Sequence, residues 1–137
     1  MWHPNNNIIF YTMLDGNHRP NKIFAHKIGS DHKNDKCIFE EKDAAYFCSP
    51  SISQSKKYLF IRTGDHQTSE YWFSPIDDFE NIKCFRKRKV KEEYEIDHAN
   101  DFFYILSNLD QCRNFKVSTT KINNINEWKD FIEYNPR

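Results

Sequence analysis

Six histidines and four cysteines are the side chains of this chain whose chemistry could support a metal site. They are His3, His18, His26, His32, His66 and His98, with Cys37, Cys48, Cys84 and Cys112. No two histidines combine ligand-like spacing with an acidic or cysteine partner, and no two cysteines are as close as in a zinc knuckle or redox motif. We therefore predict structural histidines that bond backbone groups, and reduced cysteines that fill strand positions as small hydrophobes. The sequence predicts no metal site and no cofactor.

A serine nucleophile of the hydrolase type would need the motif G-x-S-x-G, whose glycines permit a strained turn between strand and helix. The chain has three glycines, and none of them flanks a serine in this way. Ser107 and His98 illustrate a serine and a histidine that are close in sequence, but they lack such an elbow and an oxyanion site. Phosphate-binding glycine motifs do not occur either. We predict no catalytic and no cofactor-binding residues.

The basic run from Arg86 to Lys89, with Lys91, is the strongest local charge feature. Glu92, Glu93 and Glu95 follow it at once and would cancel its field. Over the whole chain 20 basic residues balance 20 acidic ones. We predict a solvated edge loop here, and no nucleic-acid partner.

The apolar stretches are short, and none approaches the roughly 20 residues that span a bilayer. The start of the chain, MWHPNNN, resembles no signal peptide. We expect a cytoplasmic protein without a membrane partner.

The elements that must position these side chains repeat along the chain. A polar turn is followed by a hydrophobic run three times: 4–7 with 8–13, 54–57 with 58–63, and 98–101 with 102–107. Within these runs Phe10, Phe60 and Tyr104 are 50 and 44 residues apart. A four-stranded propeller blade repeats at about 40–50 residues. One such unit cannot bury both of its faces, so the repeat predicts stacked units.

Further strand-like segments fill the space between the three runs. They are 21–28, 36–40, 44–49, 69–74, 82–87, 93–98, 115–120 and 128–133. The last of these also fits helical spacing and could form a helical turn instead. We predict an all-β fold, a partial β-propeller of about two and a half four-stranded antiparallel blades, with units near 1–43, 44–91 and 92–137. Two complete meanders should come first and a partial third should follow.

One long string, NKIFAHKIGSDHKNDKCIFEEKD (21–43), resembles the propeller of the oligopeptidase B (protease II) branch of the prolyl oligopeptidase family. The resemblance continues in order through TSEYWF (68–73), RKRKVKEEYEIDH (86–98), FFYILSN (102–108), NFKV (114–117) and the ending at 127–137. It covers essentially the whole chain.

The resemblance implies a fold and an activity. Members of the family pair a seven-bladed propeller with an α/β-hydrolase domain that carries a Ser-Asp-His triad. They cleave short peptides, after Lys or Arg in this branch, and the propeller restricts access to the site. Because only propeller sequence is matched, we expect the catalytic domain to be absent from this chain. Peptide substrates would then be partners only when the chain is joined to a catalytic domain.

Two other classes of function stay open. One is a non-catalytic protein-interaction module, because propeller blades expose strand edges that can add a partner strand. The other is a remnant of a broken gene. For the chain by itself, the expected partners are a complementing fragment or a second copy bound through exposed blade faces.

Overall fold

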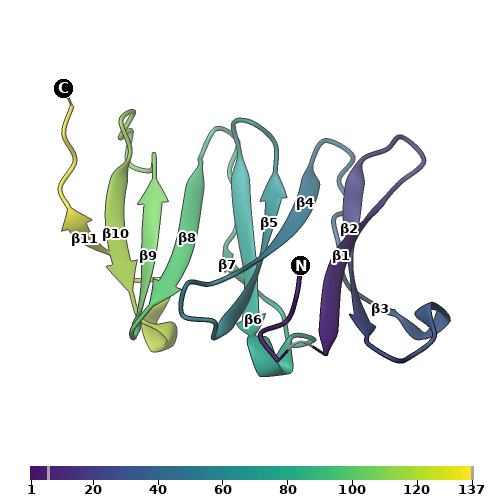
Figure 1. Ribbon diagram of the computed structural model, residues 1–137. Helices are drawn as coiled ribbons and strands as arrows, with labels where there is room; N and C mark the ends of the chain where they lie inside the picture. The colour runs from purple at the N-terminus through teal and green to yellow at the C-terminus, as the bar shows by residue number, and fades with distance from the viewer. Residues whose placement is uncertain (6, 137) are drawn as a thin grey trace.

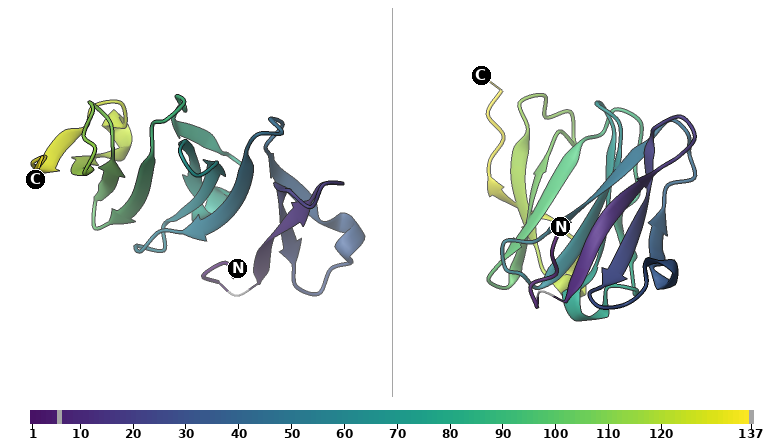
Figure 2. Two further views of the ribbon diagram at one scale, coloured as in Figure 1. Left: turned by 90° about the horizontal axis from the view of Figure 1, so that it is seen from above. Right: turned by 45° about the vertical axis from the view of Figure 1, so that its right-hand side comes forward.

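The computed structural model describes residues 1–5 and 7–136, which form three antiparallel sheets packed face to face (Figures 1 and 2). Sheet A contains β1 (Ile8–Leu14), β2 (Pro20–Lys27) and β3 (Lys36–Glu40). Sheet B contains β4 (Phe47–Ile52), β5 (Tyr58–Gly64), β6 (Ser69–Pro75) and β7 (Lys83–Arg86). Sheet C contains β8 (Tyr94–Ala99), β9 (Phe102–Ser107), β10 (Lys116–Thr120) and β11 (Lys129–Ile132). Asn6 of the first predicted turn and Arg137 of the matched ending lie outside the described residues.

The predicted all-β architecture is confirmed, with two corrections of detail. The incomplete meander comes first, because sheet A has three strands and an isolated bridge between Trp2 and Ile9, whereas sheet C has four strands. The predicted strand at 44–49 starts later, at Phe47, since the residues before it form the turn that leads from sheet A to sheet B. The segment at 128–133 is strand β11 rather than a helical turn, because it pairs with β10.

Short 3₁₀ turns are the helical elements among the described residues. They are η1 (His32–Asn34), η2 (Ile76–Asp78) and η3 (Ile122–Asn124). None of the described residues belongs to a helix that is long and apolar enough to cross a membrane.

The repeat residues show how the sheets stack. Alternate side chains of a strand face opposite sides of its sheet. Phe10 on sheet A packs with Leu59 of sheet B, and Phe60 on sheet B packs with Phe103 of sheet C. We call the side of each sheet that carries Phe10, Phe60 or Tyr104 its trailing face, and the opposite side its leading face. Each trailing face therefore packs on the leading face of the next sheet.

Aromatic side chains dominate the layer between sheets B and C. Phe73, Phe85 and Phe103 are buried and surround one another, with ring centroids 5.3–5.8 Å apart in tilted and edge-on arrangements. Such geometries are the favourable ones for aromatic pairs. Burying each of these side chains stabilises the fold by about 1.5–3 kcal/mol. This layer therefore holds the two sheets in a fixed relation and positions the connector between them.

Strand direction places the connectors of successive sheets at one end of the molecule. Strands alternate in direction, so the A-to-B connector (41–46), the β5–β6 hairpin (65–68) and the B-to-C connector (87–93) lie at the same end, the upper end in Figure 1. Side chains that are far apart in sequence are brought together there.

Candidate functional site: a buried ion-pair network at the connector end

Four polar side chains gather where the connectors meet sheet B. Glu41 is the first residue after β3, and Arg88 is the second residue after β7. Thr63 lies near the end of β5, and Glu70 lies near the start of β6. In the antiparallel β5–β6 hairpin, Thr63 lies directly opposite Glu70. The hairpin therefore supplies two members of the cluster and each connector supplies one.

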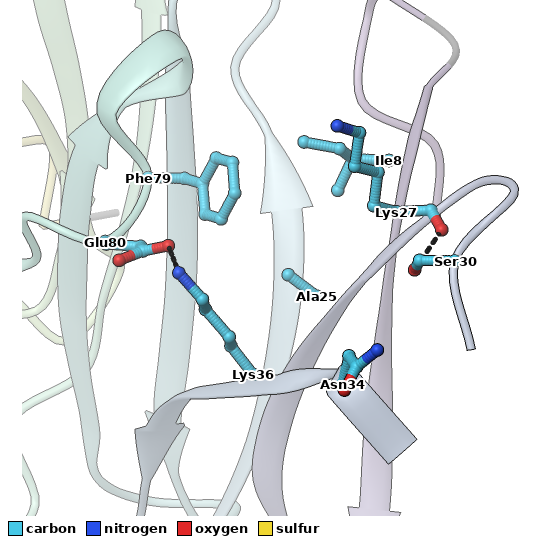
Figure 3. A pocket seen from close by; sticks show the side chains of 8 residues that line it. All are labelled: Ile8, Ala25, Lys27, Ser30, Asn34, Lys36, Phe79 and Glu80. Atoms are coloured by element: carbon cyan, nitrogen blue, oxygen red, sulfur yellow. Dashed lines mark hydrogen bonds and ion pairs between the residues drawn. The ribbon is translucent and has the colours of Figure 1, made fainter. Parts of the chain in front are cut away.

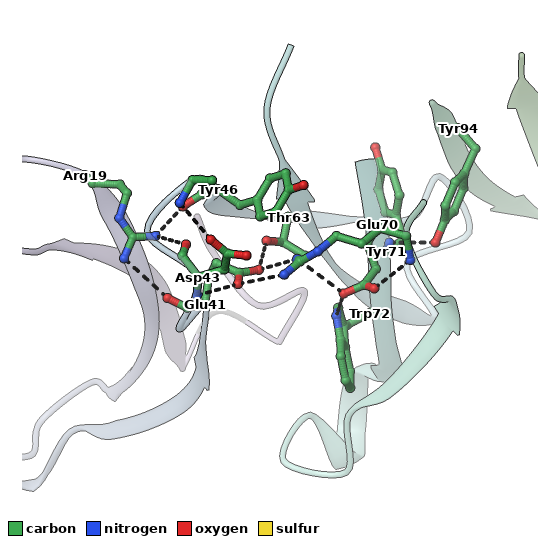
Figure 4. A network of polar contacts seen from close by, with 11 residues as sticks. Arg19, Glu41, Asp43, Tyr46, Thr63, Glu70, Tyr71, Trp72 and Tyr94 are labelled. Carbon is green, nitrogen blue, oxygen red and sulfur yellow. Dashed lines mark hydrogen bonds and ion pairs between the residues drawn. The ribbon is translucent and has the colours of Figure 1, made fainter. Parts of the chain in front are cut away.

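Arg88 is held between the carboxylates of Glu41 and Glu70; both glutamates are labelled in Figure 4. Its guanidinium donates to both oxygens of Glu41, with Nη1–Oε2 at 2.7 Å and Nη2–Oε1 at 3.1 Å. Its backbone N–H donates to Glu70 Oε2 at 2.8 Å, and Nη1 lies 3.7 Å from Glu70 Oε1. The exposed fractions of the Arg88, Glu41 and Glu70 side chains are 22%, 6% and 7%. The two-pronged pairing is the strong geometry for arginine and carboxylate.

The remaining lone pairs of the carboxylates are also used. Thr63 Oγ1 donates to Glu41 Oε2, and the backbone N–H of Asp43 donates to Oε1 at 3.0 Å. Trp72 Nε1 donates to Glu70 Oε1 at 2.7 Å. Buried charges cost free energy unless they are paired and hydrogen-bonded, and in this cluster both carboxylates meet that condition.

The pKa of Glu41 reflects this balance. Burial by itself would raise the pKa of this carboxyl, but the hydrogen bonds from Arg88 and Thr63 outweigh burial and hold it below its ordinary value. The hydrogen bond to Glu41 likewise raises the pKa of Arg88. At neutral pH the pair is therefore ionised, and its charges are neutralised within the cluster.

A second arginine holds the A-to-B connector from the other side. Arg19, in the β1–β2 hairpin, donates from Nη1 to the carbonyl oxygens of Asp43, at 2.9 Å, and Tyr46. Its Nε bonds Asp15 at 2.9 Å. The ring of Tyr46 lies under the Arg88 guanidinium, 4.1 Å from ring centroid to Cζ, a cation–π geometry. The connector is thus clamped between the two arginines.

The predicted solvated loop at 86–89 is wrong for Arg88. The acidic residues that follow the basic run suggested a solvated loop, yet the Arg88 side chain turns inward because Glu41 and Glu70 offer it two desolvated acceptors. Composition could not reveal this. The strings that resemble the family do contain the residues of this cluster. EEKD contains Glu41, TSEYWF contains Glu70 and Trp72, and RKRKV contains Arg88. The matched strings meet in space as one cluster.

The illustrative pair of Ser107 and His98 is not brought together. Ser107 lies opposite Tyr94, whereas His98 lies opposite Phe103, further along the same ladder. His98 Nδ1 instead contacts Ser55 Oγ at 2.8 Å. Burial and the nearby Lys57 lower the pKa of His98.

Among the described residues, no carboxylate bonds the His98 ring that contacts Ser55. The neighbouring carboxylate, Asp97, accepts from the backbone N–H groups of Gln54 and His98 rather than from the imidazole ring. A triad needs a carboxylate that orients the ring and an oxyanion site beside the serine. The pair therefore ties the end of β8 to the β4–β5 turn, between 53 and 57.

The other histidines are dispersed, and the prediction that they bond backbone groups is only partly right. His3 Nε2 contacts the carbonyl oxygen of Ile76 at 3.0 Å, as predicted. His26 instead bonds the carboxylate of Asp35 at 2.6 Å, and Tyr11 donates to the same carboxylate at 2.7 Å. Within the part of the chain that the structure describes, no group of three or more potential ligands could hold a metal ion. The cysteines carry free thiols.

A cavity of about 270 Å³ lies between sheets A and B near the opposite end of the molecule (Figure 3). Ile8, Ala25 and Phe79 form its apolar wall. Lys36 of β3 and Glu80 after η2 bridge the two sheets beside it, 3.1 Å apart. Both charged side chains are more than half exposed. A cavity of this size lies below the usual range for ligand sites, about 300–1,000 Å³.

Three consecutive antiparallel meanders, each packed on the next and joined by clamped connectors, define this chain as a β-propeller segment. Its sequence matches the family described as "Prolyl oligopeptidase, N-terminal beta-propeller domain" over residues 1–137. The chain belongs to the prolyl oligopeptidase family and corresponds to sequence of its N-terminal propeller.

Known relatives share this segment. Protease 2 of Moraxella lacunata is 32% identical over 128 residues, which are 93% of this chain and 18% of the relative. Dipeptidyl aminopeptidase BI of Pseudoxanthomonas mexicana is 25% identical over 137 residues, 98% of this chain and 19% of the relative. The chain thus spans about a fifth of the length of these proteins.

Solved structures show the same arrangement of sheets. Oligopeptidase B from Trypanosoma brucei, with covalently bound antipain, superposes with a TM-score of 0.93 at 27% identity, covering 99% of this chain and 20% of that one. Oligopeptidase B from Leishmania major has the same fold, with a TM-score of 0.91 at 20% identity, covering 98% and 19%. The three sheets and their connectors are therefore arranged as in these propellers.

Proposed function

We propose that this chain is the substrate-gating propeller part of a serine oligopeptidase that cleaves short peptides after Lys or Arg. The observation that carries the proposal is the match to the N-terminal propeller over all 137 residues, together with the TM-score of 0.93 to an oligopeptidase B. The preference for Lys or Arg rests on the resemblance to that branch of the family.

In this proposal the chain itself performs no bond cleavage. No carboxylate among the described residues orients the histidine in the one serine–histidine contact described above. The carboxylates of Glu41 and Glu70 already accept hydrogen bonds from Arg88. A gate needs a rigid wall, and the clamped connectors supply rigidity between successive sheets. The triad would come from other sequence. A cytoplasmic location completes the proposal and is consistent with the free thiols.

A chimaera tests the proposal. The 128 residues of Moraxella lacunata Protease 2 that match this chain are replaced by this chain. We expect the chimaera to hydrolyse fluorogenic peptides with Arg or Lys before the reporter group, and to leave a matched Ala peptide uncleaved. A folded chimaera that cleaves none of the three peptides, beside an active parent, would contradict the proposal.

Active-site labelling tests the non-catalytic role separately. The isolated chain should not react with a fluorophosphonate, because no described serine has an activated hydroxyl beside an oxyanion site. The chimaera should label with one equivalent. Stoichiometric labelling of the isolated chain would show that it carries a nucleophile of its own.

A further inference from the structure

The β4–β5 turn of sheet B (53–57) is fastened to the end of β8 in sheet C. The backbone N–H of Ser55 donates to the carbonyl oxygen of His98 at 2.9 Å, and the backbone N–H of Gln54 donates to Asp97 Oδ1 at 2.8 Å. The His98 ring adds a further contact, from Nδ1 to Ser55 Oγ at 2.8 Å. We call these contacts the His98 latch. Because strands alternate in direction, the latch lies at the end of the sheets opposite to the connectors, the lower end in Figure 1.

The His98 ring is packed in an aromatic cluster that spans both sheets. The residue is 4% exposed. The rings of Tyr58, from sheet B, and Phe103, from sheet C, each lie with their centroids 4.7 Å from that of the imidazole, at interplanar angles of 65° and 61°. Tyr58 and Phe103 also meet each other, 5.0 Å apart. A positive charge on the imidazole would therefore be buried among aromatic rings, and a buried charge is costly unless it is paired.

The charged groups around the ring do not compensate for this burial. Lys57, at the end of the turn, opposes a charge on His98, whereas Asp97 and Asp101 of sheet C favour it. Burial and Lys57 outweigh the two carboxylates and hold the pKa of His98 below its ordinary value. Asp97 Oδ1 already accepts two backbone N–H groups. Tyr58 adds no charge, because burial raises the pKa of its hydroxyl. The closed latch therefore favours the neutral imidazole.

The connector end of the same seam is held by different chemistry. The Tyr94 hydroxyl accepts from the backbone N–H of Tyr71 at 2.8 Å and donates to the carbonyl oxygen of Arg86 at 2.6 Å. Ser69 Oγ donates to the carbonyl oxygen of Tyr94 at 2.8 Å, and the Ser69 N–H donates to that of Glu92 at 3.1 Å. These hydroxyl and backbone groups do not gain a proton between pH 5 and pH 8. Mild acid should therefore act on one end of the seam.

We infer that the seam between sheets B and C carries an acid-sensitive latch, in which protonation of His98 releases the 53–57 turn from β8 while the connector end stays closed. Release exposes the imidazole to water, where its pKa is about 6.5. The open latch then binds the proton more readily than the closed one, so acidification favours the open form. The effect begins as the pH falls below about 6.5 and grows until the pH passes the lower pKa of the closed latch.

The inference goes beyond the proposed function and does not depend on peptidase activity. Both sheets of the seam belong to this chain, and the contacts of the latch lie between them. In a propeller, the release would loosen one seam of the wall at acidic pH without separating the two sheets at their connectors.

Hydrogen exchange followed by mass spectrometry tests the latch. The measured quantity is the protection factor, the ratio of the exchange rate of an amide in the unfolded chain to its rate in the folded protein at the same pH. The reporters are the N–H groups of Gln54 and Ser55, which donate across the seam. The N–H groups of Ser69 and Tyr71 are the references at the connector end. Both this chain and the chimaera described above, in which further propeller sheets flank it, are measured.

Between pH 7.5 and pH 5 we expect the protection factors of the two reporters to fall by about 3-fold to 30-fold. The upper limit is the factor by which a histidine of ordinary pKa favours its protonated form at pH 5. The protection factors of Ser69 and Tyr71 should stay constant.

Variants assign the effect to His98. His98→Phe keeps a ring in the cluster but takes up no proton, so its reporters should lose their dependence on pH. His98→Asn replaces this variant if melting curves show that it does not fold. His32→Gln is the matched control, because the His32 side chain is 82% exposed and lies in η1, away from the seam. It should behave as the wild type does.

Equal protection of Gln54 and Ser55 at the two pH values overturns the inference. So does a loss of protection that persists when His98 is replaced, because another group would then be the one that titrates. A loss shared equally by Ser69 and Tyr71 also overturns it, since the whole seam would then open and not the latch alone.

Discussion

Arg88 and Glu41 are 47 residues apart in sequence, yet they form a two-pronged ion pair with distances of 2.7 and 3.1 Å. Glu41 lies in the connector from sheet A to sheet B, and Arg88 lies in the connector from sheet B to sheet C. The pair therefore joins the segment by which the chain enters sheet B to the segment by which it leaves sheet B. A propeller depends on each sheet keeping its angle to the next, and this contact fixes the path of the chain where it passes between sheets.

Removing Arg88 should destabilise the fold strongly. Arg88→Met leaves Glu41 and Glu70 buried without their cation, and breaking a buried pair in this way costs about 3–5 kcal/mol. The partial exposure of Arg88 places the expected loss in the free energy of unfolding near the lower end of that range, about 3 kcal/mol. Urea unfolding measures it. Lys89→Met, at an exposed position of the same connector, is the control and should change stability by less than about 0.5 kcal/mol. Equal effects of the two substitutions would contradict the role assigned to Arg88.

Stability should depend on pH through Glu41. The folded state holds the pKa of Glu41 below the unfolded value of about 4.3, so the unfolded chain binds this proton more readily. Its contribution is fully present above about pH 4.3 and is lost as the pH falls through the lower, folded pKa.

The comparison of wild type with Glu41→Gln isolates this contribution, since the other carboxylates are common to both proteins. The gap between their melting temperatures should be largest at pH 7 and should narrow toward pH 3. A gap that stays constant with pH would show that ionisation of Glu41 does not stabilise the fold.

Gly64 should not tolerate a side chain. It ends β5 with a φ of +153°, and a Cβ atom there would lie 2.0 Å from the carbonyl oxygen of Thr68. Gly64→Ala must therefore displace the β5–β6 hairpin that carries Thr63 and Glu70. We expect a loss of at least about 2 kcal/mol. Gly16→Ala is the control, because no heavy atom lies within 4 Å of its Cβ position. Thermal melting of the two variants gives the comparison, and a stable Gly64→Ala variant would rule out this hairpin geometry.

The cysteines should differ in reactivity. Burial raises the pKa of the Cys48 and Cys84 thiols to about 11, so few of them are thiolates at pH 8, and the thiolate is the reactive form. Cys37 is exposed. Iodoacetamide at pH 8 should modify Cys37 first in the native chain, and Cys48 and Cys84 only after unfolding in urea. Mass spectrometry of the peptides identifies the order, and early modification of Cys48 would be the contrary result.

The sequence by itself determined the fold class and the repeat. The nearly continuous apolar runs around Phe10, Phe60 and Tyr104 indicate strands with apolar side chains on both faces, and the spacing of the runs indicates stacked meanders. These are local properties of the chain, with a period of two residues for a strand and a nearly constant length for a unit. The resemblance of strings such as EEKD and TSEYWF added the family. The resemblance did not show which of the three meanders is incomplete. We predicted the last one, whereas the structure shows that it is the first.

Only the tertiary structure decided which charged residues are buried. Arg88 and Lys89 are neighbours in one basic run, yet Arg88 is desolvated between two carboxylates while Lys89 is exposed. Likewise His98 meets Ser55, from a different sheet, rather than Ser107, from its own ladder. Such contacts depend on how separate sheets pack and on the register of their strands. The physical reason is that the free energy of a charge depends on its surroundings in space, and residues distant in sequence supply those surroundings.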